Sequence, residues 1–293
     1  MTRVFVFAAD ALDSRLVSRW RLGNLLQATN GTLKVGRDYF HEVAKMPFSP
    51  TIWTSFITGR SPSEHGVAYF FNYGNTLNIA RDFFMSNMIG KRVGRFPLVQ
   101  KLREYVRVRV NRRPVGAQDL HGLTTIAHVC RPSVVLGMPS CDDPFGLRLM
   151  VSRAVGKAST SDATSDIWKI HRTRANLVLH ALRRNTDWKL FMAYFDLADL
   201  IGHIFLTKPR PLMKAYVELD WLAGLIKKEL PPHTVFLVVS DHGMQVSPDG
   251  VGGVHSDTAF WSLNFDSQWA PNDFTDYYGK IVEWVDSESE SLT

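Results

Sequence analysis

Three apolar runs that each reach an acidic residue constrain the fold most strongly. They are residues 3–9 before Asp10, residues 188–196, which end on Asp196, and residues 233–244, which contain Asp241. Runs that stay apolar throughout are typical of strands buried on both faces of a parallel sheet. Amphipathic segments at residues 162–185 and 212–230 carry apolar residues at three- and four-residue steps, which predicts helices. The sequence therefore predicts an α/β fold with a mostly parallel sheet sandwiched by helices.

Length and composition favour a large folded chain. Its 293 residues are 45% hydrophobic, which is enough for a large core. The other predicted elements are a helix over residues 13–30 with Asn30-Gly31 as its stop, strands over 132–140 and near 259–265, and a helix around 273–285. Residues 286–293 are acidic and rich in serine, which predicts a flexible tail.

Several features of the sequence indicate the cellular compartment of the protein. No apolar run approaches the ~20 residues that span a bilayer, so we expect no transmembrane segment. The N-terminal apolar run is short and lacks a cleavage site, and reads as a strand instead of a signal peptide. Cys130 and Cys141 are too few for a disulfide framework and lack the spacing of a zinc site. These features predict a cytoplasmic protein.

One basic segment accounts for the positive charge. The chain has a formal net charge of +6, and residues 91–114 alone contain nine Lys and Arg residues against one Glu, a balance of +8. The remaining residues therefore sum to −2. The segment is either a solvated basic face or flexible insertion, or a patch that attracts an anionic substrate, nucleic acid or a membrane surface.

Residues 49–59 predict a helix with a hydroxyl at its start. Ser-Pro is a strong helix start, so Ser49 is expected at the N-cap and Pro50 at the first helical position, with Gly59 at the end. Ser49 is either an ordinary cap or a nucleophile mounted on a helix end. In the second case, N–H donors and the positive end of the helix dipole would favour an anionic phosphoryl group.

Acids and histidines gather where the predicted strands end, which is where α/β sheets bind ligands. Asp241 and His242 stand side by side before a glycine turn, and Asp199 and His203 lie four apart, on one side of a helical turn. His255 follows two glycines that would let the backbone come close to another segment. Taken singly, each has an ordinary explanation as a loop cap, a polar pair or a surface histidine.

With Asp10 and Ser49, these positions supply three carboxylates, three imidazoles and a hydroxyl, a donor set that suits two divalent ions. Three carboxylates and a serine alkoxide would offset four positive charges. An ion at the serine oxygen lowers its pKa, and a second ion stabilises the leaving oxygen. The mixed Asp and His ligands suit Zn²⁺, with Mn²⁺ or another divalent ion as the alternative.

Four segments, in order, make the chain resemble the nucleotide pyrophosphatase/phosphodiesterase branch of the alkaline phosphatase superfamily. They are VFVFAADALD at 4–13, residues 49–66 with their Thr-Gly, Pro and His-Gly, YFDLADLIGH at 194–203, and VVSDHGM at 238–244 followed by His255. The likeness spans about residues 3–75 and 132–263, and it is weak or absent across the basic segment.

The resemblance implies an alkaline-phosphatase-like fold and a two-metal hydrolase. The implied ligands are Asp10, Ser49, Asp241 and His242 for one ion, and Asp199, His203 and His255 for the other. Ser49 would attack phosphorus, and water would then release the phosphoseryl intermediate. His65 and Gly66 match a family motif as a turn and not as a ligand.

The chain departs from the family pattern at two functional positions. The family usually has a threonine nucleophile with proline two residues on, whereas Pro50 directly follows Ser49, so Thr51 is the rival nucleophile. The family asparagine that helps to hold a phosphoryl oxygen matches Phe70 here, and we assign its role to Asn72.

The predicted function is a metal-dependent phosphodiesterase or nucleotide pyrophosphatase that acts on a nucleotide or another phosphate ester. Phosphomonoesterase and phosphonate hydrolase activities are alternatives at the same site. A non-catalytic phosphate or nucleic-acid binding protein, with residues 91–114 as its binding segment, is an alternative of another class. The short chain predicts a single domain of residues 1–293 with residues 76–131 as a small basic cap that decides the substrate.

Overall fold

The computed structural model describes residues 2–42, 44–67, 71–72, 113–116, 119–120, 122–141 and 160–287. The chain divides into two compact units, one of Met1–Ala68 with Gly116–Thr293 and one of Tyr69–Val115. In the smaller unit, β3 (Phe71–Asn72) pairs with β4 (Arg113–Pro114) in the antiparallel direction. Most of the predicted cap and basic segment, and residues 288–293 of the predicted tail, lie outside the described residues, so these interpretations stay predictions.

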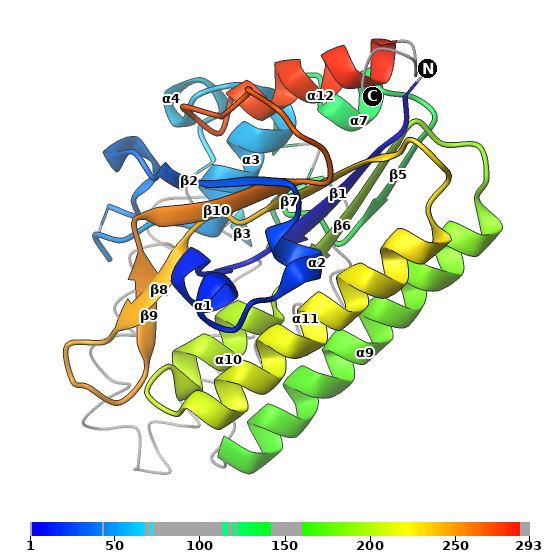
Figure 1. The fold of residues 1–293 in the computed structure, drawn as a ribbon. Helices are drawn as coiled ribbons and strands as arrows, with labels where there is room; N and C mark the ends of the chain where they lie inside the picture. The colour runs from blue at the N-terminus through cyan, green and yellow to red at the C-terminus, as the bar shows by residue number, and fades with distance from the viewer. Residues whose placement is uncertain are drawn as a thin grey trace. The chain divides into compact units, whose positions relative to one another are not determined.

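A six-stranded sheet in the order β2-β10-β7-β1-β6-β5 forms the centre of the larger unit (Figure 1). Its strands are β1 (Val4–Ala9), β2 (Thr29–Lys34), β5 (Ser133–Leu136), β6 (Leu190–Phe195), β7 (Val235–Val239) and β10 (Thr258–Leu263). β1, β5, β6 and β7 pair in parallel, whereas β10 runs antiparallel to both β7 and β2. The mostly parallel sheet is therefore confirmed.

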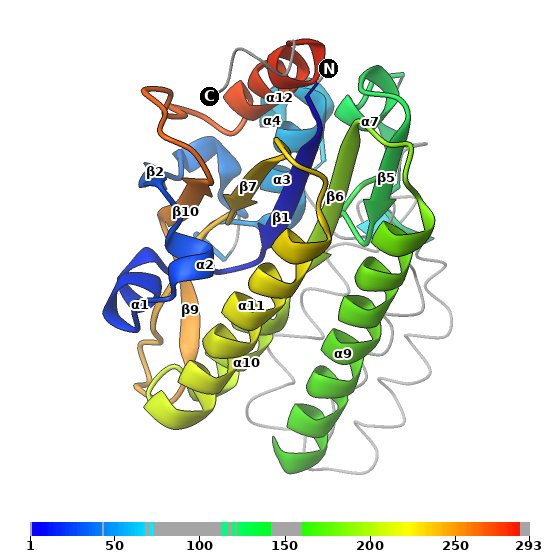
Figure 2. The same ribbon diagram turned by 45° about the vertical axis from the view of Figure 1, so that its right-hand side comes forward.

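Helices cover both faces of this sheet (Figures 1 and 2). One face carries α1 (Ser14–Arg19), α2 (Gly23–Leu26), α9 (Thr160–Arg184), α10 (Leu197–Phe205) and α11 (Pro209–Glu229). The other carries α3 (Ser49–Thr58), α7 (Ile126–Val129) and α12 (Asp276–Asp286), with α4 (Pro62–His65) beside α3. Among the described helices, none combines the length and apolar character that crossing a membrane requires.

Burial of β1 on both faces explains its apolar sequence. Phe5 and Phe7 face the α9–α11 layer, where the Phe5 ring lies 5.1 Å from the Phe191 ring and 5.3 Å from the Phe236 ring, centroid to centroid. All six residues of β1 are fully buried. Burying each such phenylalanine is worth on the order of 2 kcal/mol, so the central strands form a rigid base for whatever their ends carry.

The predicted helix over residues 13–30 is wrong at its C-terminal end. The region forms the short helices α1 and α2, and β2 begins at Thr29. Gly31, predicted to help stop a helix, lies within β2 opposite Trp261 of β10. A Cβ atom at Gly31 would come within 2.9 Å of the Trp261 ring, so the glycine permits the indole to lie across the strand.

Candidate metal centre

The carboxyl ends of β1 and β7 bring Asp10 and Asp241 together. The two strands are parallel neighbours in register, so the residues that follow them leave the sheet at the same edge. Ala11 then adopts a φ of 57°, a left-handed conformation that is uncommon for alanine. Its amide donates a hydrogen bond of 3.1 Å to Asp241 Oδ1. This turn after β1 therefore fixes the carboxylate that follows β7.

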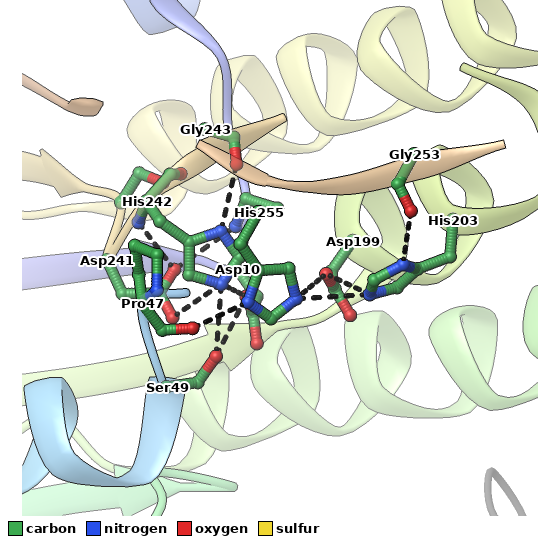
Figure 3. A network of polar contacts seen from close by, with 12 residues as sticks. Asp10, Pro47, Ser49, Asp199, His203, Asp241, His242, Gly243, Gly253 and His255 are labelled. Atoms are coloured by element: carbon green, nitrogen blue, oxygen red, sulfur yellow. Dashed lines mark hydrogen bonds and ion pairs between the residues drawn. The ribbon is translucent and has the colours of Figure 1, made fainter. Parts of the chain in front are cut away.

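Asp10, Asp241 and His242, with Ser49, form a buried cluster that we call the inner half of the site (Figure 3). His242 Nε2 lies 3.3 Å from Asp10 Oδ1 and 3.3 Å from Asp241 Oδ2. Ser49 Oγ lies 3.2 Å from the same nitrogen and 3.4 Å from Asp10 Oδ1. Four atoms that can act as metal ligands therefore converge on one small volume.

Asp199, His203 and His255 form a second cluster, the outer half of the site. Asp199 Oδ1 lies 3.1 Å from His203 Nε2 and 3.4 Å from His255 Nε2. The side chain of His203 is 39% exposed, whereas Asp199 and His255 are each 14% exposed. The His255 ring stacks on the His242 ring with 3.7 Å between centroids, so the two halves are in direct contact.

Backbone carbonyl groups orient the three imidazoles (Figure 3). The Nδ1–O distances are 3.0 Å from His242 to Gly243, 2.9 Å from His203 to Gly253, and 2.8 Å from His255 to Pro47. An Nδ1–H group that donates to a carbonyl leaves the Nε2 lone pair free to face the carboxylates. Metal-ligating histidines adopt this arrangement, with the second ring nitrogen held by a hydrogen bond.

Two carboxylate oxygens in the site are short of partners. Asp199 Oδ1 and Asp241 Oδ2 are buried, and among the described residues neither accepts a well-aligned hydrogen bond, although imidazole Nε2 atoms lie 3.1–3.4 Å away. A buried charged oxygen in this state is costly unless a cation or a donor compensates it. Each half contains one such oxygen together with imidazole Nε2 atoms. The donor set therefore fits a divalent cation in each half.

The protonation equilibria of the two halves differ. In the inner half, burial and the charges of Asp241 and Asp199 raise the pKa of Asp10 well above its usual value. Burial also lowers the pKa of His242 to about 4. In the outer half, the Asp199 charge raises the pKa of His203 to about 9. Burial would raise the pKa of Asp199 itself, but His203 and His255 hold it well below its usual value.

The two glycines before His255 let β9 approach α10. The ribbon of β8 (Gly243–Val246) and β9 (Gly253–Ser256) carries His255, and α10 carries His203. A Cβ atom at Gly253 would come within 2.6 Å of Met244 Cε and 2.7 Å of Gly202 O. The predicted close approach of the backbone is therefore confirmed, and the segment that it approaches is α10.

The predicted N-cap role of Ser49 is wrong by one residue, because Phe48 caps α3 and Ser49 is its first residue. Pro50 has no N–H group, and the amides of Thr51 and Ile52 donate to Phe48 O at 3.1 and 3.2 Å. These two of the expected N–H donors for a phosphoryl group are thus engaged within the helix. At these two positions the α3 terminus stabilises an anion through its dipole and not through free amides.

The hydroxyls of Ser49 and Thr51 face different surroundings. Ser49 Oγ lies among the carboxylates and imidazoles of the inner half. Thr51 Oγ1 donates a hydrogen bond of 3.0 Å to Val67 O. Of the two rivals, Ser49 is therefore the one in contact with the candidate ligands.

Three other predicted positions lie elsewhere. Asp196 forms an ion pair of 2.8 Å with Arg174 of α9. His65 lies in α4, where its Nδ1 accepts a hydrogen bond of 3.0 Å from the Val67 amide, which agrees with a role in a turn. Asn72 belongs to β3 of the smaller unit, and its side chain lies outside the described residues. Its assigned role therefore stays a prediction.

Tyr194 and Asp13 contact or support the site and were not predicted. The Tyr194 hydroxyl donates to Asp10 Oδ2. Asp13 accepts two side-chain hydrogen bonds from Arg15, and its Oδ2 lies 3.3 Å from the amide nitrogen of Met244, which connects α1 to β8. Both residues lie inside the segments VFVFAADALD and YFDLADLIGH, but only the pairing of β1 with β6 shows what Tyr194 reaches.

Comparisons with known proteins agree with this geometry. The family model described as type I phosphodiesterase / nucleotide pyrophosphatase matches residues 4–270. A search of the curated proteins finds no match. Among solved structures, a variant of TAB5 alkaline phosphatase with bound Mg has a TM-score of 0.50 at 10% identity, over 97% of both chains. At this identity the likeness concerns the fold, and it confirms the predicted alkaline-phosphatase-like architecture.

Two further structures are similar over most of this chain. Murine ectonucleotide pyrophosphatase/phosphodiesterase 5 in complex with AMP has a TM-score of 0.47 at 14% identity, over 85% of this chain and 59% of its own. Phosphonoacetate hydrolase from Sinorhizobium meliloti with phosphonoacetate has a TM-score of 0.48 at 11% identity, over 85% of this chain and 58% of its own. The chain thus spans less than two thirds of the length of either protein.

Proposed function

We propose, because this chain belongs to the type I phosphodiesterase/nucleotide pyrophosphatase family, that it hydrolyses phosphodiester or nucleotide pyrophosphate bonds at a two-metal site. The observation that carries the proposal is the position of Ser49 Oγ, 3.2 Å from His242 Nε2 and 3.4 Å from Asp10 Oδ1. A serine hydroxyl among metal-type ligands is the arrangement of an activated nucleophile.

The residues divide between two ions. The proposed ligands are Asp10, Ser49, Asp241 and His242 in the inner half, and Asp199, His203 and His255 in the outer half. When bound, such ions lower the pKa of the serine hydroxyl and compensate the negative charge of the phosphoryl oxygens. The mixture of carboxylate and imidazole favours Zn²⁺, with Mn²⁺ as the alternative.

The chemistry of the chain itself centres on Ser49. Its Oγ gives up its proton to solvent and forms a bond to phosphorus while the bond from phosphorus to the leaving oxygen breaks, and the leaving group takes up a proton from solvent. Water then attacks the phosphoseryl group, which releases the phosphorylated product and restores the hydroxyl. The positive end of the α3 dipole stabilises the anionic phosphoryl group next to Ser49.

A comparison of Ser49→Ala with Thr51→Ala tests this proposal. Turnover of a bis(nitrophenyl) phosphate diester should fall by roughly 10³-fold or more in Ser49→Ala, because the covalent step is lost. Thr51→Ala should stay within roughly tenfold of wild type, because it removes a hydrogen bond to Val67 O outside the cluster. If the purified protein binds no divalent metal and neither substitution changes turnover, the proposal is wrong.

The same assay separates the related activities. A nitrophenyl monoester and a phosphonate ester, run beside the diester, show whether monoester or phosphonate hydrolysis is preferred. Selection among these substrates is assigned to the proposed cap at residues 76–131 and the basic segment at residues 91–114. Binding of nucleic acid by that segment is tested by its salt dependence, since each released counterion steepens the loss of affinity with salt.

A further inference from the structure

The two carboxylate oxygens of Asp10 have different partners. Oδ1 faces the inner half, 3.4 Å from Ser49 Oγ and 3.3 Å from His242 Nε2. Oδ2 accepts a hydrogen bond from the Tyr194 hydroxyl. Tyr194 is 5% exposed and Asp10 is 4% exposed, so bulk water does not compete for this hydrogen bond. The carboxylate is therefore held in one orientation, with a single oxygen turned toward the nucleophile.

Strand β6 holds Asp10 through both its main chain and Tyr194. The Asp10 amide donates a hydrogen bond of 2.9 Å to Phe195 O, and Tyr194 lies opposite Ala8 in the parallel register of β1 and β6. This register places the tyrosine ring beside the residue that follows β1. The hydroxyl therefore reaches Asp10 because of strand pairing that the hydrophobic core already stabilises.

The ring of Tyr194 has little freedom to turn away. Trp53 of α3 packs edge-on against it, with 5.7 Å between ring centroids and an interplanar angle of 86°. The Arg174 guanidinium lies over the ring, 5.6 Å from its centroid. Packing against Trp53 and Arg174 keeps this supporting side chain in the geometry that a metal ligand needs.

We propose that Tyr194 is a positioning residue that makes Asp10 a one-oxygen ligand of the ion in the inner half. The inference rests on the proposed function, because it requires an ion there. While Oδ2 accepts the tyrosine hydrogen bond, the carboxylate cannot turn both oxygens toward an ion, and Oδ1 stays directed at Ser49 Oγ. Tyr194 acts through Asp10, as the hydrogen-bonded partners of metal ligands do in other sites.

The experiment compares Tyr194→Phe with a matched control, Tyr39→Phe. The Tyr39 hydroxyl donates a hydrogen bond of 2.6 Å to Asp273 Oδ1, so each variant loses one tyrosine–aspartate hydrogen bond. Only Tyr194 contacts a candidate ligand. Calorimetric titration of the metal-free proteins with Zn²⁺ should show an affinity about 10- to 100-fold lower for one of the two ions in Tyr194→Phe. Tyr39→Phe should bind both ions like wild type.

Cobalt spectroscopy reports on ligand geometry independently of turnover. With Co²⁺ bound, the visible absorption of Tyr194→Phe should differ from that of wild type, because the coordination of Asp10 changes, whereas that of Tyr39→Phe should not. Equal metal affinity and equal spectra in Tyr194→Phe and wild type would overturn the inference and leave the proposed function standing. Equal losses in both variants would also overturn it, as a general effect on stability. A wild-type protein that binds no divalent ion would overturn the proposed function itself.

Discussion

The inner and outer halves of the site are built by different parts of the fold. In the inner half, Asp10 and Asp241 leave the ends of neighbouring parallel strands whose residues are fully or almost fully buried. In the outer half, Asp199 and His203 lie one turn apart on α10, and His255 comes from the ribbon of β8 and β9. One half depends on the pairing of central strands, and the other on the packing of a helix against a ribbon.

This difference predicts different behaviour toward an ion and toward solvent. His242 and Asp241 of the inner half are completely buried, whereas His203 of the outer half is 39% exposed. A lost ligand in the inner half cannot readily be replaced by water, but in the outer half it can. We therefore expect the ion of the inner half to be held more tightly and that of the outer half to exchange more readily.

Among the changes that compare the two halves, the largest expected effect comes from removing one carboxylate charge from either half. Asp241→Asn and Asp199→Asn have the same size and each remove one carboxylate ligand. A bound ion supplies several kcal/mol of transition-state stabilisation, so turnover of the diester should fall by roughly 10²- to 10³-fold in each. Metal analysis after dialysis should show the greater loss in Asp241→Asn, because that position is fully buried.

The expected difference between the two halves is wrong if Asp241→Asn and Asp199→Asn lose metal to the same extent. Equal retention after dialysis would show that burial does not make one half bind its ion more tightly than the other. Added metal gives a second readout: high Zn²⁺ should restore turnover of Asp199→Asn more than that of Asp241→Asn. If Zn²⁺ restored Asp241→Asn more than Asp199→Asn, the outer half would be the one that binds its ion more tightly.

A smaller effect should come from the close approach of β9 to α10. Gly253→Ala places a Cβ atom within 2.6 Å of Met244 Cε and 2.7 Å of Gly202 O, so the ribbon must shift. Overpacking of this kind costs about 1–3 kcal/mol of unfolding free energy. The shift moves His255, so affinity should fall for the ion of the outer half only, as measured by calorimetric titration.

Gly279→Ala is the matched control for that substitution. Gly279 lies in α12, and a Cβ atom there would meet nothing within 4 Å. Replacing a glycine by alanine inside a helix should stabilise the protein by about 0.5–1 kcal/mol and leave the affinity for both ions unchanged. If Gly253→Ala instead lowered the affinity for both ions equally, the ligands of the two halves would not be positioned independently.

The inner half was largely predictable from the sequence, because strand ends carry local signals. An apolar run that stops at an acid gives both the strand and the residue that leaves it, as at Asp10 and Asp241. The four-residue spacing of Asp199 and His203 likewise needs only one helical turn. The α/β fold followed from the same runs, since strands that stay apolar must be covered on both faces.

Other features depended on contacts between distant segments and could not be predicted. Tyr194 reaches Asp10 only through the register of β1 and β6, and His255 is oriented by Pro47 O. The predicted stop at Asn30-Gly31 was wrong because Gly31 lies opposite Trp261, more than 200 residues away. No local pattern distinguishes a glycine that ends a helix from one that accommodates a distant indole.

The smallest expected effect is the pH dependence of the metal-free protein, in which His203 of the outer half and His242 of the inner half should change the stability in opposite directions. Asp199 raises the pKa of His203 to about 9, so its stabilisation should be complete below pH ~6.5 and lost as pH rises to about 9. Burial lowers the pKa of His242 to about 4, so stability should fall as pH drops from ~6.5 toward 4. Burial also lowers the pKa values of His65 and His171 to about 4, so these two residues contribute to the same loss of stability at acid pH.

Urea unfolding of the chelated protein at a series of pH values measures both effects. His203→Gln should remove most of the loss between pH ~6.5 and 9, because the imidazolium that pairs with Asp199 is gone. His242→Gln should relieve only part of the loss on the acid side, because two other buried histidines contribute to it. A wild-type profile that stays flat on the alkaline side would mean that Asp199 does not hold a charged His203. The outer half would then lack the electrostatic coupling that distinguishes it from the inner half.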